Sequence, residues 1–127
     1  MVIAMGSGIG KDIPAQEAAE LLRKLIVDRA IVQAVFTGSG SLTAALIGVV
    51  YPAPGGTAMV KPGQKQAQPV LRFDPSAATS FRVSEGRELF IGSFQDHRVN
   101  SALSFCYPDK TYVTLLELSP VTPGDEA

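Results

Sequence analysis

The segment that most constrains the fold is residues 41–51, because it is apolar on both faces that a β-strand would present. A strand buried on one side alternates apolar and polar residues, and this one does not. We therefore expect a central strand, buried on both sides, or one that curls across a barrel. Gly48 lies within the segment and is the expected bend point.

Residues 12–29 have the periodicity of an amphipathic helix. Their apolar side chains recur at intervals of three and four residues, which places them on one stripe. Asp12 can cap the first turn, and Pro14 suits a first-turn position because the N–H that it lacks would have no partner there. The stripe consists of Ala18, Leu21, Leu22, Leu25 and Ile26.

Beyond residue 30, every segment that is not a loop has the features of a β-strand. The runs are short, rich in branched and aromatic residues, and separated by Gly, Pro and polar turns. We therefore predict an N-terminal α-helix followed by a small antiparallel β-barrel of about six to seven strands. The strand-like segments are 31–37, 41–51, 57–61, 70–74, 79–83, 88–94, 101–107 and 111–118.

The remaining residues divide the chain into one domain with two flanking segments. Residues 1–11 are rich in glycine and predict a flexible leader, residues 12–118 form the helix-and-barrel domain, and residues 119–127 predict a disordered tail. Residues 62–68 and 95–100 are polar and predict exposed loops.

Composition and charge exclude several classes of protein. Apolar residues make up 46% of the chain and charged residues 18%, which excludes intrinsic disorder. The 11 basic and 12 acidic residues give a net charge of −1, which argues against a dedicated nucleic-acid or membrane-surface protein. No run is long enough to span a membrane, and the start lacks the basic residues of a signal peptide, so we expect a cytoplasmic protein.

The chain offers little that could carry out catalysis. His97 is the only histidine and lies in a polar segment, where a solvated side chain is the expected state. Cys106, the only cysteine, stands between two aromatic residues, and a buried apolar thiol is inert. One His and one Cys form neither a zinc site nor an internal disulfide. We therefore expect no enzyme activity, no catalytic residue, no metal ion and no cofactor.

Residues 18–60 resemble two families of small barrel. Their order is a helix, a strand, a glycine turn, a long strand over 42–50 and a Pro-Gly break. This order is similar to that of the β-barrel domain that precedes PilZ in flagellar brake proteins, and to the opening of Sm-like (SH3-like) barrels. The resemblance implies a small β-barrel with an N-terminal helix.

The functional residues of these families are not carried over with the resemblance. Lys61 and Lys65 stand where a PilZ domain has arginines for cyclic di-GMP, and Thr79 stands where its second motif has glycine. The uridine-binding Asp and Asn of Sm-like proteins have no match in residues 49–60. The resemblance therefore implies a fold, and neither nucleotide nor RNA binding.

We expect a non-enzymatic module that acts through protein–protein association and forms a homo-oligomer. A single small barrel does not easily bury a two-faced apolar strand together with a helix stripe, and surplus apolar surface marks interfaces. The strand edges at 70–74 and 111–118 are expected to pair between subunits. The expected interface residues are Leu42, Leu46, Val50 and Tyr51.

The alternative is a barrel that binds RNA, a nucleotide or another phosphorylated small molecule through a mildly basic face. Such binding would weaken as salt is added, because phosphate contacts release counterions. The expected ligand-binding residues are Lys61, Lys65, Arg72 and Arg82.

Overall fold

The computed structural model describes residues 10–38, 43–62, 70–85 and 97–120. Within these residues the chain forms one α-helix, eight β-strands and two 3₁₀ turns. The helix α1 spans Ala15–Val27. The strands are β1 (Lys11–Ile13), β2 (Ile31–Thr37), β3 (Thr43–Pro52), β4 (Ala58–Lys61), β5 (Leu71–Phe73), β6 (Ser80–Glu85), β7 (His97–Cys106) and β8 (Tyr112–Pro120), and the 3₁₀ turns are η1 (Pro54–Gly56) and η2 (Pro75–Ala77).

All of these strands belong to one antiparallel sheet, in the order β1-β6-β7-β8-β2-β3-β4-β5. The sheet ends at β1 and β5, and no pairing in the described part of the chain joins these two strands. Both edge strands have only 3 residues, and short edges limit unwanted pairing. The fold is therefore mainly β with one helix, as predicted, but its sheet is open and has eight strands, so the predicted small closed barrel is not confirmed.

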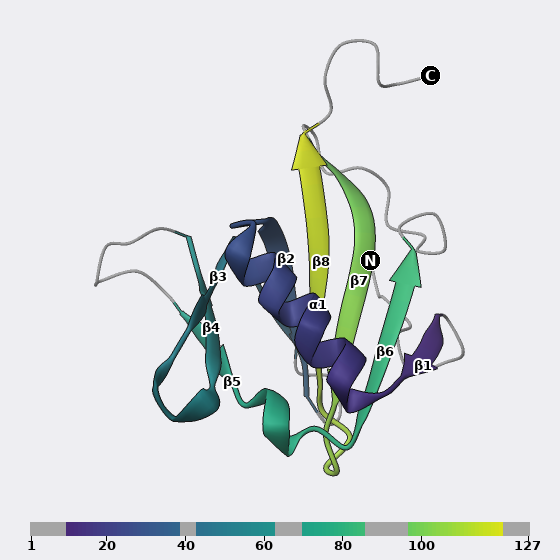
Figure 1. The fold of residues 1–127 in the computed structure, drawn as a ribbon. Coiled ribbons are helices and arrows are strands. Elements are labelled where there is room, and N and C mark those ends of the chain that lie inside the picture. Colours follow the sequence, from purple (N-terminus) through teal and green to yellow (C-terminus); the bar gives the residue numbers. More distant parts are fainter. Residues whose placement is uncertain (1–9, 39–42, 63–69, 86–96, 121–127) are drawn as a thin grey trace.

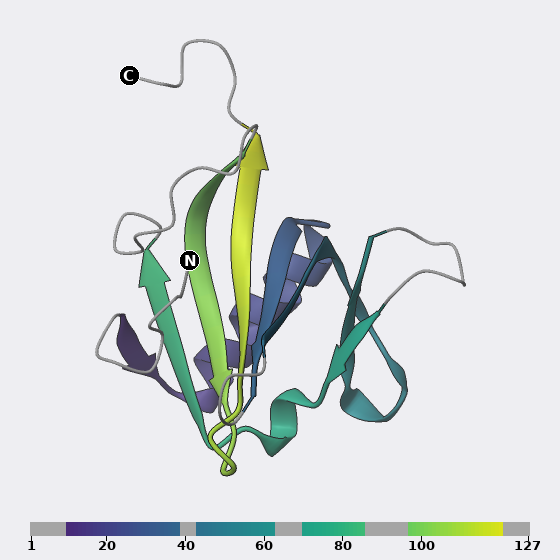
Figure 2. The same ribbon diagram turned by 180° about the vertical axis from the view of Figure 1, so that it is seen from behind.

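The helix lies against one face of the sheet, in front of β2, β8, β7 and β6 in Figure 1 and behind them in Figure 2. The sheet also curves, so strands that are distant in its order share one core. The ring of Phe105 in β7 lies 5.3 Å from that of Phe73 in β5 and 5.8 Å from that of Phe81 in β6. This curvature brings β5 back toward the face that α1 covers.

The core fills the space between α1 and the covered face of the sheet. The predicted helix is confirmed here, with Ala18, Leu22 and Leu25 buried. Each buried leucine stabilises the fold by roughly 1.5–3 kcal/mol relative to an exposed one. The buried sheet residues opposite the helix include Val32, Ala34, Leu103, Phe105, Val113 and Leu115.

The start of the helix differs from the prediction. Lys11–Ile13 pairs with β6 as the edge strand β1, so these residues are neither a leader nor a first helical turn. Pro14 is the N-cap residue of α1. Asp12 does not cap the helix, because its carboxylate forms an ion pair at 3.2 Å with Arg82 on β6.

The strand β3 bends, and the bend follows from its two partners. Its residues 43–49 pair with β2, whereas residues 49–52 pair with β4 on the other side. Gly48 lies where these ladders meet, and a Cβ at this position would lie 2.3 Å from the carbonyl oxygen of Lys61. The predicted bend at Gly48 thus also reflects a close approach of two backbones. The prediction that both faces of this strand are buried was wrong for the first half of β3, since Ala44, Ala45 and Ile47 are exposed.

Most of the other predicted strands are confirmed, with shifted ends. The segment 31–37 is confirmed residue for residue as β2. The predicted loop at 95–100 was wrong for 97–100, which begin β7. The predicted tail was wrong for Ser119 and Pro120, which belong to β8. The strand predicted at 88–94, the loop at 63–68 and the terminal segments 1–9 and 121–127 lie outside the described residues.

Candidate functional site

A notch interrupts the sheet between β3 and β5. The ladder between β3 and β4 ends at Val49. Among the described residues, residues 43–47 of β3 therefore have a pairing partner on one side only, which is β2. Across the gap, β5 is an edge strand, and β4 is its only partner among the described strands. Alternate residues of an antiparallel strand direct N–H and C=O away from a given neighbour. Each of these two edges therefore has backbone groups with no strand partner in the part of the chain that the structure describes.

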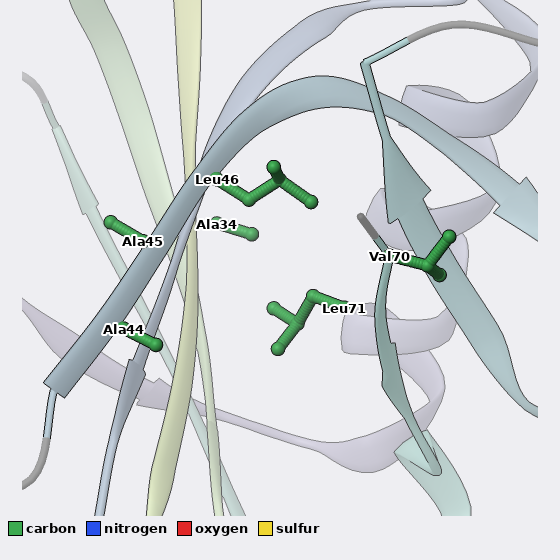
Figure 3. Close-up of a pocket in the computed structure, with 6 residues that line it drawn as sticks. All are labelled: Ala34, Ala44, Ala45, Leu46, Val70 and Leu71. Carbon is green, nitrogen blue, oxygen red and sulfur yellow. The ribbon is translucent and has the colours of Figure 1, made fainter. Parts of the chain in front are cut away.

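A hollow of about 180 Å³ lies between these two edges. Leu46 of β3 and Leu71 of β5 point into it from opposite sides, while the side chains of Ala45 and Val70 point away (Figure 3). A cavity of about 150 Å³ with similar lining accepts a benzene molecule, so the hollow has room for one large apolar side chain. Every described lining residue is apolar: Ala34, Ala44, Ala45, Leu46, Val70 and Leu71.

The far end of β5 is held by polar contacts. Tyr107 donates a hydrogen bond to the backbone carbonyl of Asp74 at 2.9 Å, which ties the end of β5 to the β7–β8 hairpin. The Asp74 carboxylate accepts from the Ser76 backbone N–H at 3.0 Å and from its hydroxyl at 2.6 Å, and so starts η2. Burial first, and then the negative charge of Asp74, raise the pKa of Tyr107 to about 12.

The strands around the notch carry basic residues and no acidic ones. From residue 29 to residue 73 the chain contains Arg29, Lys61, Lys65 and Arg72 but no Asp or Glu. The rest of the chain therefore holds all 12 acidic residues and the other 7 of the 11 basic ones. This asymmetry lies in the sequence itself, and the balanced overall charge conceals it.

Two of the predicted ligand-binding residues lie on neighbouring strands beside the notch. Arg72 donates from Nε to the Thr57 hydroxyl at 3.2 Å and from Nη2 to the Pro54 carbonyl at 3.4 Å, which orients its guanidinium. The Lys61 ammonium lies 5.1 Å from the centre of the Tyr51 ring. Neither side chain forms an ion pair with a described acidic residue, so both cations lack a counter-charge of their own in that part of the chain.

The other two predicted ligand-binding residues are not brought to this place. Arg82 lies on β6, on the far side of the sheet order, and pairs with Asp12. Lys65 lies outside the described residues. The structure thus divides the predicted basic face, and among the described residues Lys61 and Arg72 lie on the neighbouring strands β4 and β5.

The predicted interface residues also separate. Leu46 lines the notch, and Tyr51 is partly buried beneath Lys61. Val50 has 1% of its surface exposed and belongs to the core of its own chain, so its side chain has no surface to offer a partner. Leu42 lies outside the described residues.

The two predicted strand edges have opposite outcomes. Residues 70–74 do contain an edge strand, β5. Residues 111–118 do not, because β8 pairs with β7 on one side and β2 on the other. A long apolar strand at the end of a chain resembles an edge in the sequence, but here it occupies the centre of the sheet.

The outer face of β2 and β3, opposite α1, carries an apolar patch that sequence reasoning missed. Ile31 is 38% exposed and Ile47 is 47% exposed. Ile31 pairs with Val49, and Gln33 pairs with Ile47, so these side chains share one face. The signal was present as the second apolar face of residues 41–51, but the interface residues predicted on this strand were Leu42, Leu46, Val50 and Tyr51.

Polar chemistry elsewhere in the described residues is sparse. A recess of about 190 Å³ between α1 and β7–β8 has an apolar floor, with Lys24, Asp28, Ser101 and Glu117 among its lining residues. No group of 3 or more His, Cys, Asp or Glu side chains that could hold a metal ion comes together within the described ranges. In the same part of the chain, no helix has the length and apolar character required to cross a membrane.

Comparison with protein-family models, with curated proteins and with solved structures finds no match to this chain. The resemblance to the domain before PilZ and to Sm-like barrels therefore stays a prediction. The case for function depends on the surface and the charges of the chain itself.

Proposed function

We propose that the chain is a non-enzymatic association module that forms a homo-oligomer through the outer face of β2 and β3. The observation that carries this proposal is the pair of exposed isoleucines, Ile31 and Ile47, on adjacent strands of that face. On folded chains, apolar residues that lie together in a patch mark interaction sites, whereas singly scattered ones do not.

The rest of the outer face favours contact with a second copy. The residues that alternate with the buried Val32 and Ala34 of β2, and their partners on β3, are all uncharged. A two-fold axis through this face would therefore bring no like charges together. Each isoleucine would take part in the contact twice, once from each copy. The outward-facing set is Ile31, Gln33, Val35, Thr37, Thr43, Ala45, Ile47 and Val49.

The exposed fractions of the two isoleucines set how much they contribute to such a contact. Complete burial of an exposed isoleucine is worth roughly 1.5–3 kcal/mol, and these two are about half buried already, so each adds about 1 kcal/mol per copy. Across a symmetric contact the two isoleucines then contribute about 4 kcal/mol in total. Such a contact is insensitive to salt, because no charge takes part in it.

Size-exclusion chromatography with light scattering, at low and high salt, tests the proposal. The wild-type chain is expected to have the mass of a discrete oligomer at both salt concentrations. Ile47→Glu should shift it to a monomer, because it places a carboxylate in the apolar contact. Ser80→Glu adds the same charge at an exposed position on β6 and should leave the mass unchanged. A monomeric wild-type chain, or an unchanged mass for Ile47→Glu, would refute the proposed interface.

A further inference from the structure

The hollow of the notch lies on the inner side of β3, towards Leu46, whereas the proposed oligomer face is the outer side of the same strand. We propose that this notch binds an extended peptide segment of another protein, which adds a strand to β3 and has acidic residues flanking an apolar core. Three independent observations specify this partner: the unpaired edge, the apolar hollow and the surrounding charge.

The first observation concerns the backbone. Residues 43–47 of β3 have a ladder only with β2 in the described part of the chain. Backbone N–H and C=O groups are strong hydrogen-bonding groups, and an edge with a row of them is a template for one more strand. The partner that satisfies such a row is itself an extended backbone, as in other strand-addition complexes.

The second observation concerns the side chains. A strand that pairs with residues 43–47 directs alternate side chains to the inner face, where the hollow of about 180 Å³ is lined by Leu46 and Leu71 (Figure 3). Hydrogen bonds along the edge supply affinity, and the hollow selects an apolar side chain at alternate positions. A large aliphatic or aromatic side chain fits this volume.

The third observation concerns charge. Lys61 and Arg72 belong to β4 and β5, the strands that border the notch, although neither side chain lines the hollow. Neither has an acidic partner in the described residues, and no carboxylate occurs from residue 29 to residue 73. The Arg72 guanidinium is already oriented by its bonds to Thr57 and Pro54, and its remaining N–H donors are open to a carboxylate. Acidic residues at the ends of the bound segment complement this charge, which favours an acidic peptide over a basic or neutral one.

The test uses the full-length chain and a fluorescent peptide in which Leu and Val alternate with Thr, with a pair of glutamates at each end. A second peptide has the same core between pairs of lysines. Fluorescence anisotropy is expected to show that the glutamate-flanked peptide binds more tightly by at least about tenfold (roughly 1.4 kcal/mol). On binding, hydrogen exchange of amides within residues 43–47 should slow.

Two sets of variants separate the apolar and charged parts of the notch. Ala44→Glu places a carboxylate at the exposed mouth of the hollow and should abolish binding, whereas Ala19→Glu makes the same change at an exposed position of α1 and should not affect it. The double variant K61Q/R72Q should weaken binding about tenfold (roughly 1.4 kcal/mol). The matched control K11Q/R23Q removes the same charge from two exposed positions outside residues 29–73 and should leave the affinity for the peptide unchanged.

Several results would overturn the proposal. It is wrong if neither peptide binds, if both bind equally, or if Ala44→Glu binds as wild type does. Protection of residues 43–47 that rises with protein concentration alone would identify a second copy as the occupant. Single-stranded RNA that binds through Lys61 and Arg72 without protecting residues 43–47 would favour the phosphate-binding alternative. The oligomer face is tested by the solution mass of Ile47→Glu, and the notch is tested by peptide binding. The two proposals can therefore fail independently.

Discussion

Replacement of Gly48 by alanine tests the central feature of the fold, which is the crossing of β3 by its two ladders. A Cβ at this position would lie 2.3 Å from the carbonyl oxygen of Lys61 and 2.5 Å from its carbonyl carbon. The first of these distances is about 1 Å short of the 3.4 Å at which ordinary contact begins. Because the obstructing atoms belong to backbone, no side-chain rotation relieves the clash, and β4 must move.

The expected loss follows from two opposing effects. Overpacking that shifts the backbone costs about 1–3 kcal/mol, and a clash with a strand backbone belongs at the upper end of this range. Alanine also restricts the unfolded chain, which stabilises the folded state by about 0.4–1 kcal/mol. Gly48→Ala should therefore lower the free energy of unfolding by about 2 kcal/mol, or the melting temperature by roughly 5–10 °C for a chain of this size.

Urea unfolding followed by far-ultraviolet circular dichroism measures this loss. The matched control is Gly55→Ala in η1, where φ is +77° and no atom lies within 4 Å of the added Cβ. Its cost arises from the left-handed backbone alone and should be about 1 kcal/mol. If Gly48→Ala is as stable as wild type, then the glycine provides only a flexible bend and the close backbone approach is not a constraint.

Two further predictions concern buried polar groups. The buried Ser84 hydroxyl has no hydrogen-bond partner within the described residues, so Ser84→Ala should raise the free energy of unfolding in urea by about 1 kcal/mol. Ser104→Ala should instead lower it by about 1–2 kcal/mol, because this change breaks the 3.0 Å hydrogen bond to Thr114. Equal effects of the two substitutions would contradict this reasoning. Burial, and then the Asp74 charge, raise the pKa of Tyr107 from 10.0 to about 12 in the folded chain. As pH rises, the unfolded chain therefore loses this proton before the folded chain does. The stability that Tyr107 contributes should be lost as pH rises from about 10 to about 12. Tyr107→Phe should show a shallower decline in unfolding free energy over that alkaline range, and an equal slope would contradict the assignment.

Elements with a strong local signal could be predicted from the sequence. The spacing of Ala18, Leu22 and Leu25 requires a helix with one buried stripe, and α1 has it. The segment 31–37 has branched residues between clear boundaries, and it is β2. The β7–β8 hairpin was found through its Pro-Asp-Lys turn, where the Asp109 carboxylate accepts from the Thr111 hydroxyl at 2.6 Å and its pKa is lowered by that bond.

Elements that depend on distant partners could not be predicted from the sequence. Lys11–Ile13 has no strand pattern of its own, and it becomes β1 because β6 offers an edge some seventy residues later in the chain. Residues 97–100 are polar, yet they extend β7 because β8 supplies a partner as far as Pro120. In both cases a ladder formed over a long sequence separation outweighs a weak local preference.

The candidate sites also combine features that the sequence predicts locally with features that depend on distant partners. They show why an apolar pattern alone does not identify a buried strand. The apolar character of residues 41–51 could be read from the sequence, but their burial depends on where each neighbouring strand ends, and β4 ends at Lys61, opposite Val49. Ala44, Ala45 and Ile47 are therefore apolar and exposed, and exposed apolar residues that lie together on a surface are typical of an interaction site. The inner side of this strand borders an apolar hollow and its outer side is uncharged, which is why the two proposals assign its two faces to two different partners.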